Sequence, residues 1–225
     1  VRASWGDSFK IYSDNNILAT QRLLEACRDV GIKKFVYASS SSIYGDVSTL
    51  PMNEDMSPRP ISPYGVSKLA GEHLCYLYWK NFGVPTVSLR YFTVYGPRQR
   101  PDMAFHRFIK AVLAGEEIAI YGDGNQTRDF TYVSDIVSAN LLAAESDAEG
   151  EVYNIGGGSR ISVNQVIKVI ETLTGSKARL KYMDAQKGDV RDTYADISKA
   201  QADLGYAPEV EIEKGLGRFV EWISK

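Results

Sequence analysis

Two short stretches of this sequence carry side chains whose types and spacing could do chemistry. The first is a run of serines at 39–42, directly after the apolar segment 34–38, which predicts a buried strand. The second is Tyr64 with Lys68, four residues apart at the start of a helical pattern, so both side chains lie on one face. A phenol is a weak base at neutral pH, and a nearby ammonium lowers its pKa by favouring the phenolate. With a serine hydroxyl on the same substrate oxygen, these groups could take a proton from a secondary alcohol while a cofactor takes the hydride.

A tyrosine and a lysine at this spacing also occur by chance on solvated helix faces, so the context has to decide. A serine run after a buried strand, followed by this pair at a helix start, resembles the extended short-chain dehydrogenase/reductase family. Three further stretches resemble its nucleotide-sugar epimerases: 14–20 (DNNILAT), 90–97 (RYFTVYGP) and 128–133 (RDFTYV). The resemblance implies an α/β fold, in which a partial Rossmann-like parallel sheet is joined to a smaller C-terminal mixed α/β domain that binds substrate.

The resemblance also implies roles for individual residues, with NAD as cofactor and a UDP-sugar as substrate. It assigns catalysis to Ser40, Tyr64 and Lys68. A guanidinium can donate to two phosphate oxygens, which suits the diphosphate role implied for Arg128, although a surface ion pair with a neighbouring aspartate is the alternative. The implied cofactor contacts are Asn15, Ser39, Tyr64, Lys68, Tyr91 and Phe92. The implied substrate contacts are Ser41, Ser42, Thr93, Arg100, Ala119, Ile120, Tyr121, Arg128 and Asp189.

The identity of the sugar depends mainly on one position. Many relatives that epimerise UDP-glucose have asparagine where this chain has Thr93, and the stretch 93–104 resembles instead the epimerases of UDP-hexuronic acids. The resemblance therefore implies conversion of UDP-glucuronate to UDP-galacturonate through a 4-keto intermediate. A UDP-glucose or N-acetyl-sugar 4-epimerase is the alternative, since threonine can simply replace asparagine as a hydrogen-bonding loop residue. Related dehydratases and decarboxylases of this superfamily carry an acidic residue in the serine loop. None stands before Tyr44 here, so the resemblance argues against both activities.

The sequence lacks the opening of a dinucleotide-binding fold, which is a strand, a glycine-rich turn and a helix. We expect about one βαβαβ half, on the order of eighty residues, to precede Val1. A hypothesis of another class is therefore a cofactor-free chain that only binds or dimerises. We expect residues 1–97, with 126–155, to belong to the dinucleotide-binding domain, and 98–125 with 156–225 to form the nucleotide-sugar-binding domain.

Composition limits the possible partners. The chain has 225 residues, 44% of them hydrophobic, and a formal net charge of -2, which predicts a sizeable core and neither nucleic acid nor membrane as partner. Two cysteines make no disulfide framework and predict free thiols in a reducing, cytoplasmic compartment. No Cys/His cluster has zinc-like spacing, so no metal site is expected. The helices predicted at 14–29 and 64–82 carry apolar residues beyond one stripe, and the resemblance implies that they form a homodimer through a four-helix bundle.

Periodicity and turn residues predict the remaining elements. Ser13 or Asp14 is expected to cap the first helix, and Gly31 to end it. A strand, a helix and a second strand in succession predict parallel pairing. The further strands are expected at 84–89, 118–121 and 151–155, and the further helices at 105–113, 133–145, 162–173 and 212–223.

Overall fold

The central element of the protein is a parallel sheet. The computed structural model describes residues 1–184, 186 and 188–225. In this sheet β2 (Thr86–Tyr91) lies between β1 (Phe35–Ser40) and β6 (Glu151–Ile155), and both pairings are parallel. The chain passes through helices between these strands, as parallel pairing requires. The predicted α/β class with a parallel sheet is confirmed.

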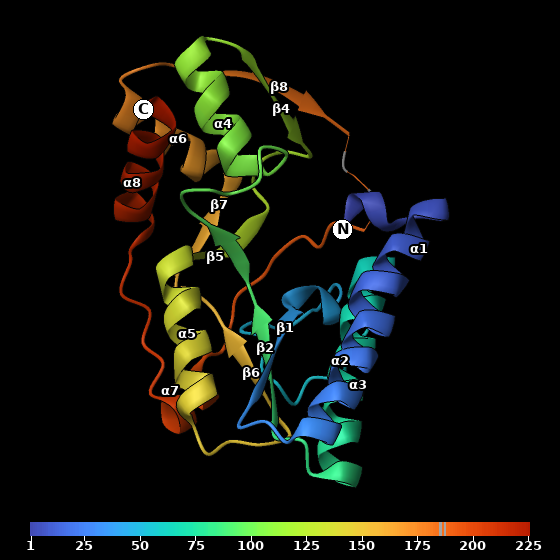
Figure 1. Cartoon of the computed structure of the whole chain (residues 1–225). Coiled ribbons are helices and arrows are strands. Elements are labelled where there is room, and N and C mark those ends of the chain that lie inside the picture. The colour runs from blue at the N-terminus through green and yellow to red at the C-terminus, as the bar shows by residue number, and fades with distance from the viewer. Residues whose placement is uncertain (185, 187) are drawn as a thin grey trace.

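Helices cover both faces of this sheet (Figure 1). On one face lie α2 (Ala19–Val30) and α3 (Pro63–Phe82), which pack side by side. On the other lie α5 (Val133–Glu145) and α7 (Ser198–Leu204). The result is a three-layer arrangement in which the carboxyl ends of the strands point toward the second part of the molecule.

The second part has its own apolar core, which includes Tyr95, Ile109, Phe130, Ile170 and Leu216. Short strands and three helices enclose it, at the upper end of the view in Figure 1. They are β3 (Thr93–Tyr95), β4 (Glu117–Tyr121), β5 (Thr127–Tyr132), β7 (Arg160–Ser162), β8 (Arg179–Met183), α4 (Ala104–Ala114), α6 (Val163–Thr174) and α8 (Ile212–Ser224). Strand β5 pairs with β3 and β7, and β4 pairs with β8.

Helix α3 begins and ends where local chemistry dictates. The Ser62 side chain accepts a hydrogen bond from the backbone N–H of Gly65, and Pro63 stands in the first turn, where its missing N–H costs nothing. Gly83 ends the helix in the left-handed conformation, with φ of 67°. These signals fix where Tyr64 enters the site.

Two predicted boundaries are wrong, each for an identifiable reason. The first helix already begins at Phe9 and runs through a π-helical segment, η3 (Ser13–Leu18), into α2. Ser13 is therefore inside the helix and caps nothing, and Asp14 instead pairs with Lys10 one turn earlier. Strand β2 begins two residues later than expected, because the N–H of Val84 bonds back to the Tyr78 carbonyl in the turn that closes α3.

Several short elements are not predicted from the sequence at all. Strands β3, β7 and β8 and helix α7 contain three to seven residues each, too few for periodicity to reveal them. The stretch 197–206 packs against the core of the parallel sheet through Ala200, Leu204 and Tyr206, although the sequence places it in the smaller domain. The division into two domains stays a prediction.

The described residues also bear on the expected partners. No helix among them is both long and apolar enough to cross a bilayer. No group of three or more metal-ligating side chains comes together within the part of the chain that the structure covers. Cys27 and Cys75 are free thiols, as predicted.

Candidate active site

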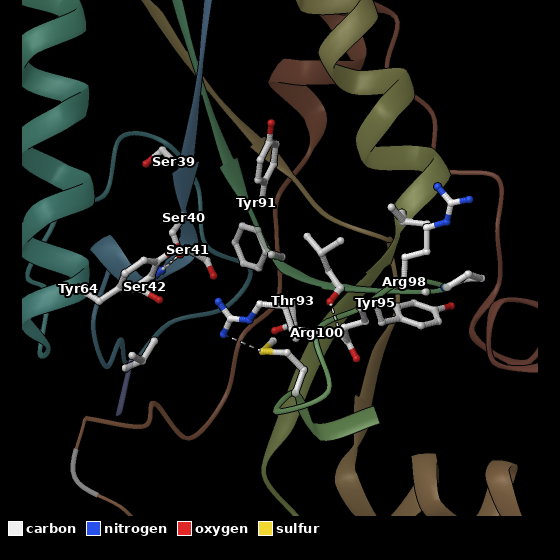
Figure 2. A pocket seen from close by; sticks show the side chains of 18 of the residues that line it. Ser39, Ser40, Ser41, Ser42, Tyr64, Tyr91, Thr93, Tyr95, Arg98 and Arg100 are labelled. Atoms are coloured by element: carbon white, nitrogen blue, oxygen red, sulfur yellow. Dashed lines mark hydrogen bonds between the residues drawn. The ribbon is translucent and has the colours of Figure 1, made fainter. Parts of the chain in front are cut away.

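A cavity of about 720 Å³ lies at the carboxyl ends of β1 and β2, the edge of a parallel sheet at which ligands bind in such folds. The serine loop forms one wall, and the segment that follows β2 forms the other (Figure 2). The structure thus brings together many of the residues that the sequence singles out: Ser39, Ser40, Ser41, Ser42, Tyr64, Tyr91, Phe92, Thr93 and Arg100.

Ser40 and Tyr64 meet in this cavity because a strand end and a helix start converge there. Ser40 is the last residue of β1, and its hydroxyl accepts a hydrogen bond from the N–H of Ser42 at 3.2 Å. Burial raises the pKa of the Tyr64 phenol above its ordinary value, whereas hydrogen bonding with the Ser40 hydroxyl and the charge of Arg100 lower it. The phenol therefore has one hydroxyl partner and one cationic neighbour that favour its ionised form.

Lys68 does not act on Tyr64 as the sequence predicts. Its ammonium donates to the Ala38 carbonyl at 2.9 Å, lies 5.9 Å from the centre of the Tyr64 ring, and has its own pKa lowered by burial. Because desolvation of the phenol dominates, the pKa of Tyr64 is raised and not lowered in the protein alone. The expected geometry of the pair on one helix face is present, but the expected direction of the pKa shift is wrong.

A second, smaller cavity of about 140 Å³ adjoins the first. The two share Ser41, Ser42 and Thr93, and the smaller one adds Arg128 and Asp189. The Arg128 guanidinium donates to the backbone carbonyls of 190 and 191, which holds the 188–193 segment against β5. The alternative is a surface ion pair with a neighbouring aspartate, and the next two along the chain, Asp129 and Asp135, accept hydrogen bonds from backbone N–H groups.

Asn15 does not join the site. It is exposed, its side-chain amide donates to the Ile11 carbonyl at 2.8 Å, and it lines neither cavity. The next residue, Asn16, instead faces α3 and donates to the Ser67 hydroxyl at 2.9 Å. The π-helical segment widens the helix by one residue per turn, which shifts the faces that a regular α-helix would present.

The stretch 119–121 also lies outside both cavities. Ile120 is 1% exposed and packs in the core of the second part, so its side chain is not available to a ligand. Ala119 lines a separate cavity of about 240 Å³ beside α4. Alternation along β4 explains the difference, since neighbouring strand residues point to opposite faces.

The main cavity is also lined by residues that the sequence does not single out, among them Tyr12, Arg98 and Gln99. Tyr12 meets the Tyr64 ring edge-on, with ring centres 6.1 Å apart. Arg98 has a φ of 67°, a left-handed conformation that is uncommon for a residue with a side chain. Gln99 donates from its amide to the Val94 carbonyl at 2.9 Å, which leaves its buried carbonyl oxygen without a partner among the described residues. The motif at 96–99 could have indicated the last two, whereas nothing in the local sequence indicates Tyr12.

Comparison with known proteins identifies the family. Residues 1–156 match the NAD dependent epimerase/dehydratase family. The chain belongs to this family. It is 49% identical to an uncharacterized UDP-glucose epimerase, YtcB, of Bacillus subtilis, covering 100% of this chain and 71% of that protein. It is 46% identical to a UDP-glucuronate 4-epimerase of Thermodesulfobacterium geofontis, covering 99% and 68%.

A solved structure extends the similarity to the fold. The UDP-glucuronic acid 4-epimerase of Bacillus cereus, in complex with UDP-glucuronic acid and NAD, superposes with a TM-score of 0.97 at 49% identity. The match covers 100% of this chain and 72% of that one. The predicted membership of the nucleotide-sugar epimerases and the Rossmann-like fold are therefore confirmed.

Proposed function

We propose that the protein catalyses NAD-dependent C4 epimerisation of a UDP-sugar, with UDP-glucuronate as the preferred substrate and UDP-galacturonate as the product. The observation that carries the proposal is one cavity in which the Tyr64 phenol and the Ser40 hydroxyl face Thr93 and Arg100. The first two groups suit proton transfer, and the last two suit a carboxylate. The names of the relatives from Thermodesulfobacterium geofontis and Bacillus cereus support the same substrate.

The donors and surfaces of the cavity fit the nicotinamide end of NAD. Tyr91 and Phe92 offer aromatic surface, and the unpartnered oxygen of Gln99 can accept a hydrogen bond from an amide. Tyr64 and Lys68 would hold the nicotinamide ribose through their hydroxyl and ammonium groups. The chemistry that NAD supplies when bound is reversible hydride transfer with C4 of the sugar.

The residues of this chain would manage the proton. Tyr64 would take the proton of the 4-hydroxyl as hydride leaves C4 for the cofactor, which gives a 4-keto sugar, and Ser40 would orient the oxygen through its hydroxyl. After the sugar has turned over in the cavity, hydride would return to the opposite face of C4 and Tyr64 would return the proton to the oxygen, so the configuration at C4 is inverted. Arg128 would anchor the diphosphate during this rotation, because the smaller cavity that it lines shares Thr93 with the main one.

A uronate places a further demand on the site. Its 4-keto form is a β-keto acid, which loses CO₂ when the carboxylate is free to align with the carbonyl. Ser41, Ser42 and Thr93 line both cavities and would donate hydroxyl hydrogen bonds that hold the carboxylate. Arg100 forms a bidentate ion pair with Asp102, with Nε 3.0 Å from Oδ1 and Nη2 2.9 Å from Oδ2. A substrate carboxylate would therefore compete with Asp102 for the guanidinium of Arg100.

The second candidate function is a UDP-glucose 4-epimerase, which the name of the Bacillus subtilis relative favours. A hydroxymethyl group would fit the same space but would gain less, because charge-assisted hydrogen bonds are about twice as strong as neutral ones. One or two such bonds, at roughly 1.5–3 kcal/mol each, give a preference for UDP-glucuronate on the order of ten to a thousand in kcat/KM.

The test is a direct comparison of the two sugars at equal concentration, with the products separated by chromatography. Equal or faster conversion of UDP-glucose would transfer the protein to the glucose-type epimerases. Nucleotide released from the purified protein and measured by mass spectrometry separates an NAD enzyme from a cofactor-free binding protein.

The proposed assembly is a homodimer. Large apolar side chains on the paired helices stay exposed: Leu18, Leu23, Tyr76, Leu77 and Phe82 are 43–56% exposed. Exposed apolar side chains on two packed helices fit a four-helix bundle with a second copy.

A further inference from the structure

A row of polar side chains crosses the central sheet at the edge of the main cavity. Ser39, Arg90 and Asn154 stand at the same level of β1, β2 and β6, and are 3%, 5% and 0% exposed. Placing a guanidinium in the middle of a buried sheet is costly unless the charge is paired and hydrogen-bonded. The chemistry proposed above uses neither Arg90 nor Asn154, so the presence of this polar row needs another explanation.

The charge of Arg90 is met by Glu72 of α3. Arg90 binds the carboxylate of Glu72 in a bidentate manner: Nε lies 3.0 Å from Oε1 and Nη2 lies 2.9 Å from Oε2. Its Nη1 donates to the Tyr44 hydroxyl at 2.8 Å, and Tyr44 in turn donates to Asn154. The Ser39 hydroxyl, at the cavity wall, donates to the same Glu72 carboxylate. The pair is therefore bonded at both ends, by two parallel bonds whose geometry tolerates little displacement.

This ion pair acts on the helix face that carries the base. Tyr64, Lys68 and Glu72 are each four residues apart, so they share one face of α3, and the ion pair lies about 12 Å along the axis from Tyr64. The helix lies close against β1, because a side chain at Gly71 would come within 2.0 Å of the Tyr37 hydroxyl. Tyr37 of β1 also packs with Cys75 and Tyr78 of α3 in an apolar cluster. Apolar contacts are non-directional, so the hydrogen-bonded ion pair is the contact that fixes how far α3 can slide or rotate.

We propose that the buried Glu72–Arg90 pair is a positioning device, which holds α3 in the place where the Tyr64 phenol meets the Ser40 hydroxyl. The proposal rests on the proposed function, in which Tyr64 is the base. Stability alone is a poor explanation, because replacing a buried ion pair by apolar residues of similar volume is often neutral or stabilising. Positioning of the base explains the pair better, since a displacement of a catalytic group by about 1 Å can lower the rate on the order of a hundredfold.

The test replaces the pair as a unit in the holoenzyme, as Glu72→Leu with Arg90→Met. We expect a Tm close to that of the wild type and an unchanged KM, with kcat lower by on the order of a hundredfold. Loss of the Ser40 contact also raises the pKa of Tyr64, so the rising limb of the pH–rate profile should move to higher pH. The matched control is Cys75→Ala, one turn further along α3 and 1% exposed, which should lower Tm and leave kcat and the pH profile unchanged.

Each further outcome decides the matter. A folded double variant with wild-type kcat and pH profile overturns the proposal. If the double variant does not fold, the fallback is Glu72→Asp, which keeps the charge but shortens the side chain by one methylene. It should lower kcat without changing KM, and a wild-type kcat in this variant overturns the proposal. If the wild type converts no UDP-sugar, the proposed function fails by itself. The positioning role is then judged by the ultraviolet titration of Tyr64, measured as the difference from Tyr64→Phe, which must shift upward in the double variant.

Discussion

Asp129 gives a quantitative prediction about how stability depends on pH. The residue is 0% exposed, and its carboxylate accepts hydrogen bonds from the N–H groups of Gly157 at 2.7 Å and Ala195 at 3.1 Å. Burial raises its pKa from 3.8 to about 6, against the opposing effect of those two bonds. The folded protein therefore holds this proton more tightly than the unfolded chain does. This contribution to stability is fully present below about pH 4 and is lost as the pH rises through about 6.

The magnitude follows from the shift itself and is about 3 kcal/mol. Asp129→Asn cannot ionise, so the stability of the wild type relative to this variant should fall by that amount between about pH 4 and pH 8. Urea unfolding of both proteins across this range measures the difference. The side-chain NH₂ group of this variant would face one of the two backbone N–H donors and lose that hydrogen bond. This loss of stability is the same at every pH, so it does not change how the stability difference depends on pH.

A surface aspartate supplies the contrasting control. The Arg100 guanidinium holds the pKa of Asp102 below its ordinary value, so its small contribution has the opposite sign and is lost as the pH falls. Parallel stability curves for the wild type and Asp129→Asn would refute the reasoning about burial at this position.

The remaining predictions concern the site and the assembly. Tyr64→Phe removes the proposed base and should lower kcat by at least about a hundredfold, and near-normal turnover would remove Tyr64 from the mechanism. Thr93→Val deletes one hydroxyl at nearly constant volume and should lower kcat/KM for UDP-glucuronate by on the order of tenfold, with less effect on UDP-glucose; equal losses would show that Thr93 does not contact the C5 substituent. Light scattering should show a dimer at micromolar concentration that Leu23→Glu converts to monomer, whereas a wild-type monomer would contradict the proposed helix pairing.

The site illustrates how far local signals reach. Ser62, Pro63 and Gly83 are enough to predict α3, because caps act on backbone groups within one turn. The spacing of Tyr64 and Lys68 then fixes their common face. This spacing does not determine the direction in which the pKa of Tyr64 shifts, since that direction depends on how deeply the phenol is buried in the folded protein.

Other features depend on contacts between distant parts of the chain. Asn15 and Asn16 are equivalent as sequence, and only the π-helical segment and the hydroxyl of Ser67 on α3 decide which of them faces inward. In the same way, alternation along β4 turns Ile120 into the core, although the family resemblance implies a substrate contact there. The short strands form because segments distant in the sequence pair with them through backbone hydrogen bonds. Such strands contain too few residues to show an alternating hydrophobic pattern in the sequence.

The sequence by itself therefore determined the family, the parallel α/β class, the caps of the long helices and the groups able to move a proton. Only the tertiary structure decided which of those groups share a cavity, that the Tyr12 ring meets the Tyr64 ring edge-on, and that Glu72 binds Arg90 across the layer between helix and sheet. The physical reason is range: caps and helix faces are set by neighbours along the chain, whereas desolvation and ion pairing are set by whatever residues folding brings near.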